Sequence, residues 1–440
     1  MKNKKWMAIL LGGIMAASLA APCSVSAAEK TTLTFWHAMG GTNGEVLQQI
    51  VDDFNASQDE IEIKAEYQGT YDDTITKLKA AMQSDSGLPD VCQMYDVGTK
   101  FMYDSGAVIP VEDKFESTGY DKSSVMDVIS SYYTVEGKQY AMPFNVSTPM
   151  LYYNKDVFKA AGLDPETPPT TYDEVLEDAK KIVESGAAPV GYSQAIYGWF
   201  FEQQLAGLGV TYGNNDNGRT EAVTAVDFDS NGGGLKVFDM WKKLYDSGCF
   251  EDYGTTTADT QTAFFSGQVG MIIESTAILK NAVDSSPFEV GTGYLPRIEQ
   301  NDEGGVIIGG GSLWLTDTGN EANEDAAWKF IEYITTPDVQ AKWSMGTGYF
   351  AINEKAYETD DMKAYLKENP NFETAINQLK DSPVNCNTAG VLSGVQTEAR
   401  LTFNEIMPQV YDGKLTTQDA VDQLAASVNK AIENYNESIK

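Results

Sequence analysis

The sequence of 440 residues is poor in histidine, cysteine and basic side chains. It has one histidine, His37, and 31 lysines and arginines against 64 acidic residues, so its formal net charge is -33. A single imidazole excludes most metal sites and catalytic schemes that depend on histidine. The negative charge disfavours nucleic acid and anionic membrane surfaces as partners, because like charges repel. The sequence also has no G-x-S-x-G, G-x-x-x-x-G-K or H-E-x-x-H motif. We therefore expect no catalytic residue, no metal and no cofactor.

The N-terminus has the pattern of a secretory signal peptide. Lysines at positions 2, 4 and 5 precede an apolar stretch over residues 6–21, and Val25-Ser26-Ala27 offers small residues for cleavage. The stretch is shorter than the roughly 20 residues that a membrane-spanning helix needs. We expect residues 1–27 to be a signal peptide and the protein to be periplasmic or extracellular at the cell surface. Lipid anchoring through Cys23 is an alternative that Pro22 disfavours, because proline breaks the small-residue pattern of such a site.

Three cysteines remain in the mature chain, Cys92, Cys249 and Cys386. An odd, widely spaced set does not form a disulfide framework. Cys92 lies in an apolar, strand-like run and is expected to fill core space.

Apolar residues switch repeatedly between strand and helix periods along the mature chain. Strand-like segments at 32–36, 61–67 and 89–95 are separated by helical segments, which is typical of an α/β fold with a mostly parallel sheet. A hairpin is predicted within 130–144 and an amphipathic helix over 171–184. Since no linker separates two halves, the pattern predicts two α/β lobes that exchange crossover segments around a cleft.

Two features have both a functional and a structural interpretation. Asp227, Asp229 and Asn231 match the first half of a calcium-binding loop, but Phe238 stands where its closing carboxylate belongs, so an acidic turn is favoured. His37 ends the first predicted strand, where a structural hydrogen bond is favoured over contact with a ligand.

Arginine is scarce, with Arg219, Arg297 and Arg400 as the three examples. Arg400 either pairs with an acidic side chain or holds an anion, because a guanidinium suits both partners. The glycines at 309–311 precede a predicted strand and form either an anion-binding nest or a plain turn. The 7 Trp, 23 Tyr and 18 Phe fit either a core or a site that stacks on sugar faces. The residues alone leave these alternatives open.

Longer segments carry a resemblance to one family. The most specific are TFWH at 34–37, PFNVSTP at 143–149 and GGGSLW at 309–314, while LYYNKD at 151–156 and TGY at 347–349 are shared more widely. Over essentially the whole mature chain the sequence resembles the extracellular solute-binding proteins of bacterial ABC importers, of the carbohydrate-binding type. Within that family it looks most like the members that bind sn-glycerol-3-phosphate.

The resemblance implies a two-lobed periplasmic-binding-protein fold of type II, whose lobes close on a ligand like a hinged clamp. Lobe 1 would comprise residues 28–143 and 276–345, and lobe 2 would comprise 144–275 and 346–440. It implies a monomer that delivers its ligand to an ABC permease and performs no chemistry on it. The implied ligand-binding residues are Tyr71, Asp96, Ser147, Trp199, Ser275, Gly310, Tyr349 and Arg400, with Ile196 beside them.

The matched residues imply a division of roles. Arg400, with Ser147, Ser275 and the Gly310 N–H, would hold a phosphate. Tyr71 and Asp96 would orient a glycerol, Trp199 would wall the cleft and Tyr349 would donate its hydroxyl. Two positions depart from the pattern near the site: Ile196 replaces a tryptophan and would widen the pocket, and Ala351 replaces a proline near Tyr349.

We therefore expect capture of sn-glycerol-3-phosphate or a glycerophosphodiester such as glycerophosphocholine. A neutral-oligosaccharide receptor is the first alternative. A secreted phosphodiesterase is a second, disfavoured by the single histidine, and surface adhesion is a third.

Overall fold

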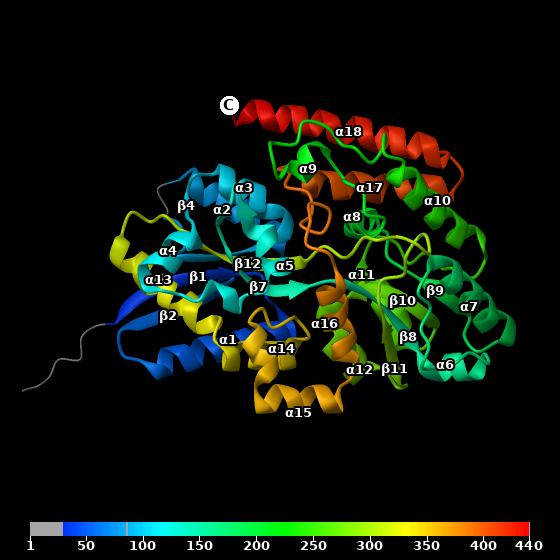
Figure 1. Ribbon diagram of the computed structural model, residues 1–440, viewed down its shortest axis with the longest axis horizontal. Helices are drawn as coiled ribbons and strands as arrows, with labels where there is room; N and C mark the ends of the chain where they lie inside the picture. Colours follow the sequence, from blue (N-terminus) through cyan, green and yellow to red (C-terminus); the bar gives the residue numbers. More distant parts are fainter. Residues whose placement is uncertain (1–29, 85–86, 440) are drawn as a thin grey trace, which may run out of the picture.

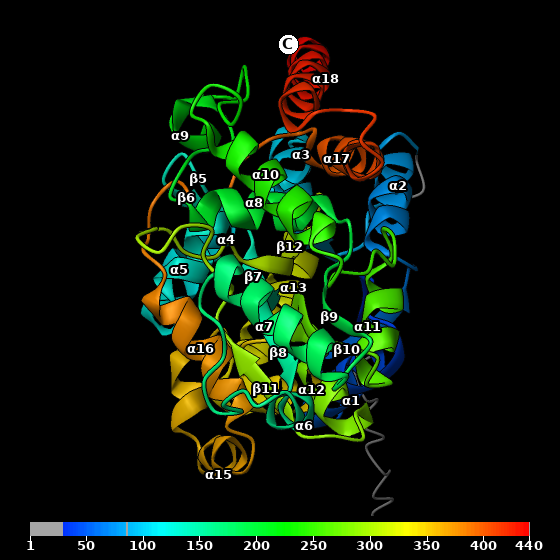
Figure 2. The same cartoon turned by 90° about the vertical axis from the view of Figure 1, so that its right-hand side faces the viewer.

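The computed structural model describes residues 30–84 and 87–439, which form two α/β lobes that lie side by side in Figure 1 and one behind the other in Figure 2. The predicted signal peptide and Cys23 lie outside the described residues. No helix within the described ranges is long and apolar enough to cross a membrane. Two large clusters of buried apolar side chains form the cores, one mainly in each lobe.

The first sheet lies on the left in Figure 1 and has the strand order β2-β1-β3-β12-β4, with β7 also paired to β12. β1 runs parallel to β2 and β3, whereas β12 is antiparallel to β3. The strands are β1 (Thr31–His37), β2 (Ile61–Tyr67), β3 (Val91–Tyr95), β4 (Val108–Ile109), β7 (Met142–Ser147) and β12 (Gly309–Thr316). Helix α1 (Gly41–Ser57) covers the sheet because its buried residues recur at helical spacing, at Leu47, Ile50, Val51 and Phe54.

The second sheet lies on the right and has the order β11-β8-β10-β9. β10 is parallel to β9 and antiparallel to β8. Its strands are β8 (Pro149–Asn154), β9 (Val190–Ser193), β10 (Val269–Ser275) and β11 (Val290–Gly293). Three helices pack together above it, α8 (Gly198–Gly207), α17 (Gln396–Tyr411) and α18 (Thr417–Ser438).

The chain passes between the sheets at β7–β8 and again between β11 and β12. These crossovers confirm the prediction of lobes that exchange segments. The predicted lobe division does not follow the sheets at two places: β11 pairs with β8 of the second sheet, and most of β7 belongs to the first. Alternating pattern alone does not reveal which sheet a strand joins, because its partner is set by long-range pairing.

Local sequence signals explain several elements. The helix predicted over 171–184 is α7 (Tyr172–Ser185), which begins with a capping box between Thr171 and Glu174 and ends at Gly186 in the left-handed conformation. Strands β5 (Thr134–Val135) and β6 (Lys138–Gln139) form the predicted hairpin, with Glu136 and Gly137 both at positive φ.

The other helices connect these sheets and cover their faces. In chain order they are α2 (Tyr71–Met82), α3 (Thr99–Asp104), α4 (Val111–Thr118), α5 (Asp127–Ser130), α6 (Lys155–Ala160), α9 (Asn214–Gly218), α10 (Gly233–Asp246), α11 (Thr257–Phe265), α12 (Leu279–Ser285), α13 (Glu321–Ile334), α14 (Pro337–Thr347), α15 (Asp360–Glu368) and α16 (Asn371–Asp381).

Candidate ligand-binding site

A buried ion cluster joins the two lobes. Arg400 on α17 donates from Nε and Nη2 to the two carboxylate oxygens of Glu202 on α8, both at 2.7 Å. Its Nη2 also donates to Asp96 Oδ2 at 2.7 Å, and Asp96 directly follows β3 of the first sheet. The three side chains are only 6–8% exposed. One guanidinium is therefore shared by a carboxylate of its own lobe and one of the other lobe.

The electrostatics of this cluster favour a charged arginine. Burial alone would lower the pKa of Arg400, but the carboxylates of Asp96 and Glu202 raise it well above its usual range. Burial raises the pKa of the Glu202 carboxyl, and the Arg400 guanidinium opposes that rise. With both carboxylates ionised, the cluster has a net charge of one negative unit.

A second cluster lies between α2, β7 and the residues after α14. Asn145 donates from Nδ2 to the Tyr71 hydroxyl at 2.6 Å and accepts from Gln93 Nε2 at its own Oδ1 at 2.6 Å. Burial raises the pKa of Tyr349, while hydrogen bonds with Asn145 and Tyr71 lower it. The Tyr71 ring stacks on the Tyr95 ring, with ring centroids 5.2 Å apart. Tyr95 directly precedes Asp96 in the chain. The hydroxyls of Tyr71 and Tyr349 are thus held at one place by a fixed amide.

Trp199 and the glycine-rich strand meet beside these clusters. A side chain at Gly309 would place its Cβ 2.8 Å from the Trp199 ring. The Trp199 Nε1 is buried and has no hydrogen-bond partner in the described part of the chain. An unpaired buried donor is costly unless a further acceptor reaches it.

The glycines at 309–311 do not form the nest or turn that the sequence suggested. They begin β12, and their partners in β7 run from Ser147 to Asn145. Gly310 has φ +90°, and a Cβ there would lie 1.8 Å from the Asn145 carbonyl oxygen. The glycines are therefore needed for close strand pairing. Consecutive glycines in a sequence are compatible with both close strand pairing and a nest, so the sequence alone does not separate the two.

The two predicted serines lie at strand ends. Ser147 is buried at the end of β7, opposite Gly309. Ser275 ends β10, and its hydroxyl oxygen accepts the backbone N–H of Ala277. The preceding residue, Glu274, is buried, and burial raises the pKa of its carboxyl.

Ile196 is 1% exposed and belongs to the second core, with its N–H donating to the Gly254 carbonyl. It lies three residues before Trp199 in the turn that leads into α8.

Sequence reasoning missed Glu202 and Asn145. Glu202 lies in a helix whose other residues from Gly198 to Ala206 are all buried. A lone acid in such an apolar helix is a signal that could have found it, because buried carboxylates are paired. No local signal identifies its partner, which lies 198 residues further along the chain.

The other candidates have structural surroundings. The His37 imidazole accepts the Met39 N–H at Nδ1, and burial lowers its pKa to about 4. Arg219 is partly buried and donates to the carbonyl oxygens of Tyr132, Ala389 and Gly390. In the acidic turn, Asp227 accepts from the Thr211 hydroxyl. Cys92 is buried in the core, as predicted.

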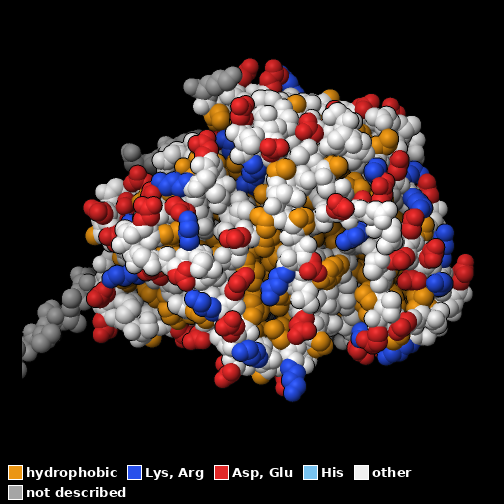
Figure 3. Space-filling view, viewed as in Figure 1, with side chains coloured by type: hydrophobic (Ala, Val, Ile, Leu, Met, Phe, Trp, Pro, Cys, Tyr) orange, Lys and Arg blue, Asp and Glu red, His pale blue; other side chains and the backbone are white. Residues whose placement is uncertain are grey.

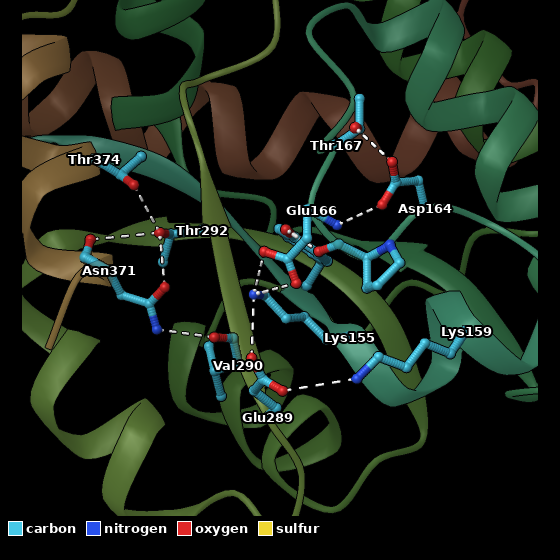
Figure 4. A network of polar contacts seen from close by, with 12 residues as sticks. Lys155, Lys159, Asp164, Glu166, Thr167, Glu289, Val290, Thr292, Asn371 and Thr374 are labelled. Carbon is cyan, nitrogen blue, oxygen red and sulfur yellow. Dashed lines mark hydrogen bonds and ion pairs between the residues drawn. The ribbon is translucent and has the colours of Figure 1, made fainter. Parts of the chain in front are cut away.

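A cavity of about 560 Å³ lies apart from these clusters, between the loop at 168–170, the β11–β12 connection and α16. None of the nine predicted residues lines it. Two lining residues of this cavity, Thr292 and Thr374, are joined by a hydrogen bond of 2.9 Å, and the same close view shows Lys155 paired with Glu166 and Glu289 (Figure 4). On the face in Figure 3, apolar side chains gather along the middle of the molecule between mixed charges.

Comparison with known proteins identifies the class. A family model described as bacterial extracellular solute-binding protein matches residues 49–374. The chain therefore belongs to the bacterial extracellular solute-binding proteins.

Individual relatives narrow the comparison. The chain is 31% identical over 417 residues to the sn-glycerol-3-phosphate-binding periplasmic protein UgpB of Escherichia coli strain K12, covering 93% of this chain and 94% of the relative. It shares 25% identity and a TM-score of 0.77 with a cyclic alpha-maltosyl-1,6-maltose binding protein from Arthrobacter globiformis, covering 92% of this chain and 100% of the other. It shares 20% identity and a TM-score of 0.79 with UgpB from Mycobacterium tuberculosis in complex with glycerophosphocholine, covering 92% and 99%.

These matches confirm the predicted family and the two-lobed α/β fold. The protein is a solute-binding component of an ABC importer with a periplasmic or extracellular location. Such proteins bind small ligands and deliver them to permease components.

Proposed function

We propose that this protein captures sn-glycerol-3-phosphate or a glycerophosphodiester and delivers it to a membrane permease without chemical change. The observation that carries the proposal is Arg400, a buried guanidinium whose Nη2 contacts Asp96 of the opposite lobe. A ligand phosphate oxygen is an acceptor of the same kind as the Asp96 carboxylate, so it can make the same contact when it enters between the lobes. The E. coli relative, named for sn-glycerol-3-phosphate, is 31% identical.

The surrounding residues suit the rest of such a ligand. Tyr71 and Tyr349 present hydroxyls beside Asn145, and Asp96 offers carboxylate oxygens to glycerol hydroxyls. The unpaired Trp199 Nε1 is a donor for a further oxygen of the ligand. Charge-assisted hydrogen bonds contribute about 1.5–3 kcal/mol each, so a few of them support micromolar binding.

Ser147, Ser275 and Gly310 complete the proposed phosphate contacts, and Ile196 leaves room for a diester headgroup. We also propose that the protein is a monomer whose two lobes follow the two sheets, with β7 in the first lobe and β11 in the second. Measurement of the mass of the mature protein would show whether a lipid is attached at Cys23.

Titration calorimetry with glycerol-3-phosphate, glycerophosphocholine and maltose tests the proposal, using protein refolded to remove bound ligand. Binding of either phosphate with no heat from maltose is expected. Binding of maltose with no heat from either phosphate compound would establish the neutral-sugar alternative. The similar structure of a cyclic alpha-maltosyl-1,6-maltose binding protein is the reason for including maltose. Release of choline from glycerophosphocholine would instead indicate a phosphodiesterase.

An Arg400→Ala variant tests the residue itself. Phosphate affinity should fall well over tenfold, because at least one charge-assisted hydrogen bond is lost. Unchanged affinity in a variant that still folds would exclude Arg400 as the phosphate ligand.

A further inference from the structure

Glu202 holds one whole edge of the Arg400 guanidinium. The pair is bidentate, with Nε and Nη2 each 2.7 Å from a different carboxylate oxygen. Gln396, one turn earlier on α17, donates to the same carboxylate at 2.8 Å. Two parallel bonds fix both the position and the plane of a guanidinium.

The helix packing explains why the pair forms. Gly198 begins α8 directly against α17, and a Cβ there would lie 2.5 Å from the Arg400 Cα. This close approach brings Glu202, one turn along α8, to the Arg400 side chain. Both residues belong to helices packed in the same lobe, so the pair does not depend on lobe closure.

A ligand can approach the other side of the guanidinium, which presents Nη1 and the Nη2 hydrogen that contacts Asp96. Among the described residues, Nη1 of Arg400 has no hydrogen-bond acceptor, whereas Nε and Nη2 are engaged. The charge of the arginine is already balanced by Glu202 within lobe 2, and Asp96 adds a second carboxylate. The site therefore offers N–H donors to an anion, while the charges of Arg400, Glu202 and Asp96 sum to a negative value.

We propose that Glu202 is a positioning residue that also sets charge selectivity: it orients Arg400 and cancels its charge, so that the cleft prefers a monoanionic phosphodiester to a dianionic phosphomonoester. The inference rests on the proposed function, since it concerns the same phosphate contact. Glu202 is not among the ligand-binding residues that the family resemblance implies, and the inference gives it the choice between the two ligand classes.

The native protein provides the first test. Glycerol-3-phosphate and its methyl ester differ at pH 8 by one unit of charge and little in size, because the second phosphate ionisation has a pKa of about 6. The methyl ester should bind at least about tenfold more tightly, as expected for one extra charge a few ångströms from an uncompensated carboxylate. Equal or tighter binding of glycerol-3-phosphate would overturn the inference. Binding of neither compound would instead overturn the proposed function and the inference with it.

Glu202→Gln provides the second test, with Glu398→Gln as the matched control. Glu398 is exposed on the same helix as Arg400, so its substitution removes one charge without touching the guanidinium. Glu202→Gln should bring the ratio of the two Kd values to within about threefold of unity, chiefly by strengthening binding of glycerol-3-phosphate. The control should leave the ratio unchanged.

A merely structural role of Glu202 predicts a different result, in which both affinities fall together and the ratio stays at its native value. That outcome would overturn the selectivity role. If the variant does not fold, the native ratio decides the question.

Discussion

Replacing Arg400 with methionine tests whether the ion cluster is buried and coupled. The substitution leaves the Glu202 carboxylate 6% exposed and stripped of two hydrogen bonds, with Gln396 as its remaining donor. Removing one partner of a buried ion pair costs about 3–5 kcal/mol. Asp96 adds less to this cost, because opening of the lobes returns its carboxylate to water. We expect Arg400→Met to lower the free energy of unfolding by about 3–5 kcal/mol.

The second half of the experiment is the double variant Arg400→Met with Glu202→Gln. A neutral amide in place of the unpaired carboxylate should restore all but about 1–2 kcal/mol, because the cost arises mainly from the buried charge. Urea unfolding followed by tryptophan fluorescence and circular dichroism measures both values. Lys414→Met, which breaks an exposed pair with Asp412, is the control and should cost less than about 1 kcal/mol. A cost below about 1 kcal/mol for Arg400→Met, or no recovery in the double variant, would refute the buried pair.

Two further predictions concern stability. The pKa of His37 is about 4 in the folded protein instead of 6.5, so the unfolded chain binds more protons between those values and stability falls as pH falls through that window. The test compares the free energies of unfolding of the native protein and His37→Gln, because Glu and Asp titration affects both proteins equally. The difference between the two free energies should change by at most about 3 kcal/mol from pH 7 to pH 4. A constant difference would contradict the buried neutral imidazole. Gly310→Ala should cost at least about 2 kcal/mol in urea unfolding, because its Cβ meets the Asn145 carbonyl, whereas Gly248→Ala has open space at a similar φ and should cost about 1 kcal/mol. Equal costs for the two alanines would show that the close strand contact is absent.

Local features of the fold were predictable from the sequence because their causes are local. The α7 helix has its cap residue, its apolar spacing and its terminal glycine within 16 residues. The hairpin at Glu136-Gly137 follows mainly from Gly137, because glycine adopts positive φ without steric cost. Strand membership was not predictable, since β11 joins a strand more than 130 residues earlier in the chain.

The candidate site shows the same division. The scarcity of arginine draws attention to Arg400, whose guanidinium suits both an ion pair and an anionic ligand. The structure shows the ion pair, with partners 198 and 304 residues away that no spacing rule connects. The glycines at 309–311 belong to strand β12 and not to a nest or turn before it. The sequence does not decide this, because glycine indicates close backbone approach without indicating which segment approaches.

Asp96 has two effects on a phosphate ligand that one variant can separate. Its carboxylate contacts Arg400 Nη2 at 2.7 Å, where it competes with a phosphate oxygen. In the proposed site the same carboxylate accepts hydrogen bonds from glycerol hydroxyls. Asp96→Asn should therefore strengthen binding of inorganic phosphate several-fold, because the competing charge is removed, and should weaken binding of glycerol-3-phosphate relative to inorganic phosphate. Calorimetry with the two ligands measures this ratio. If both affinities rise by the same factor, Asp96 is only a competitor and the glycerol must be oriented by other residues; if both fall, the interlobe ion pair is needed for closure.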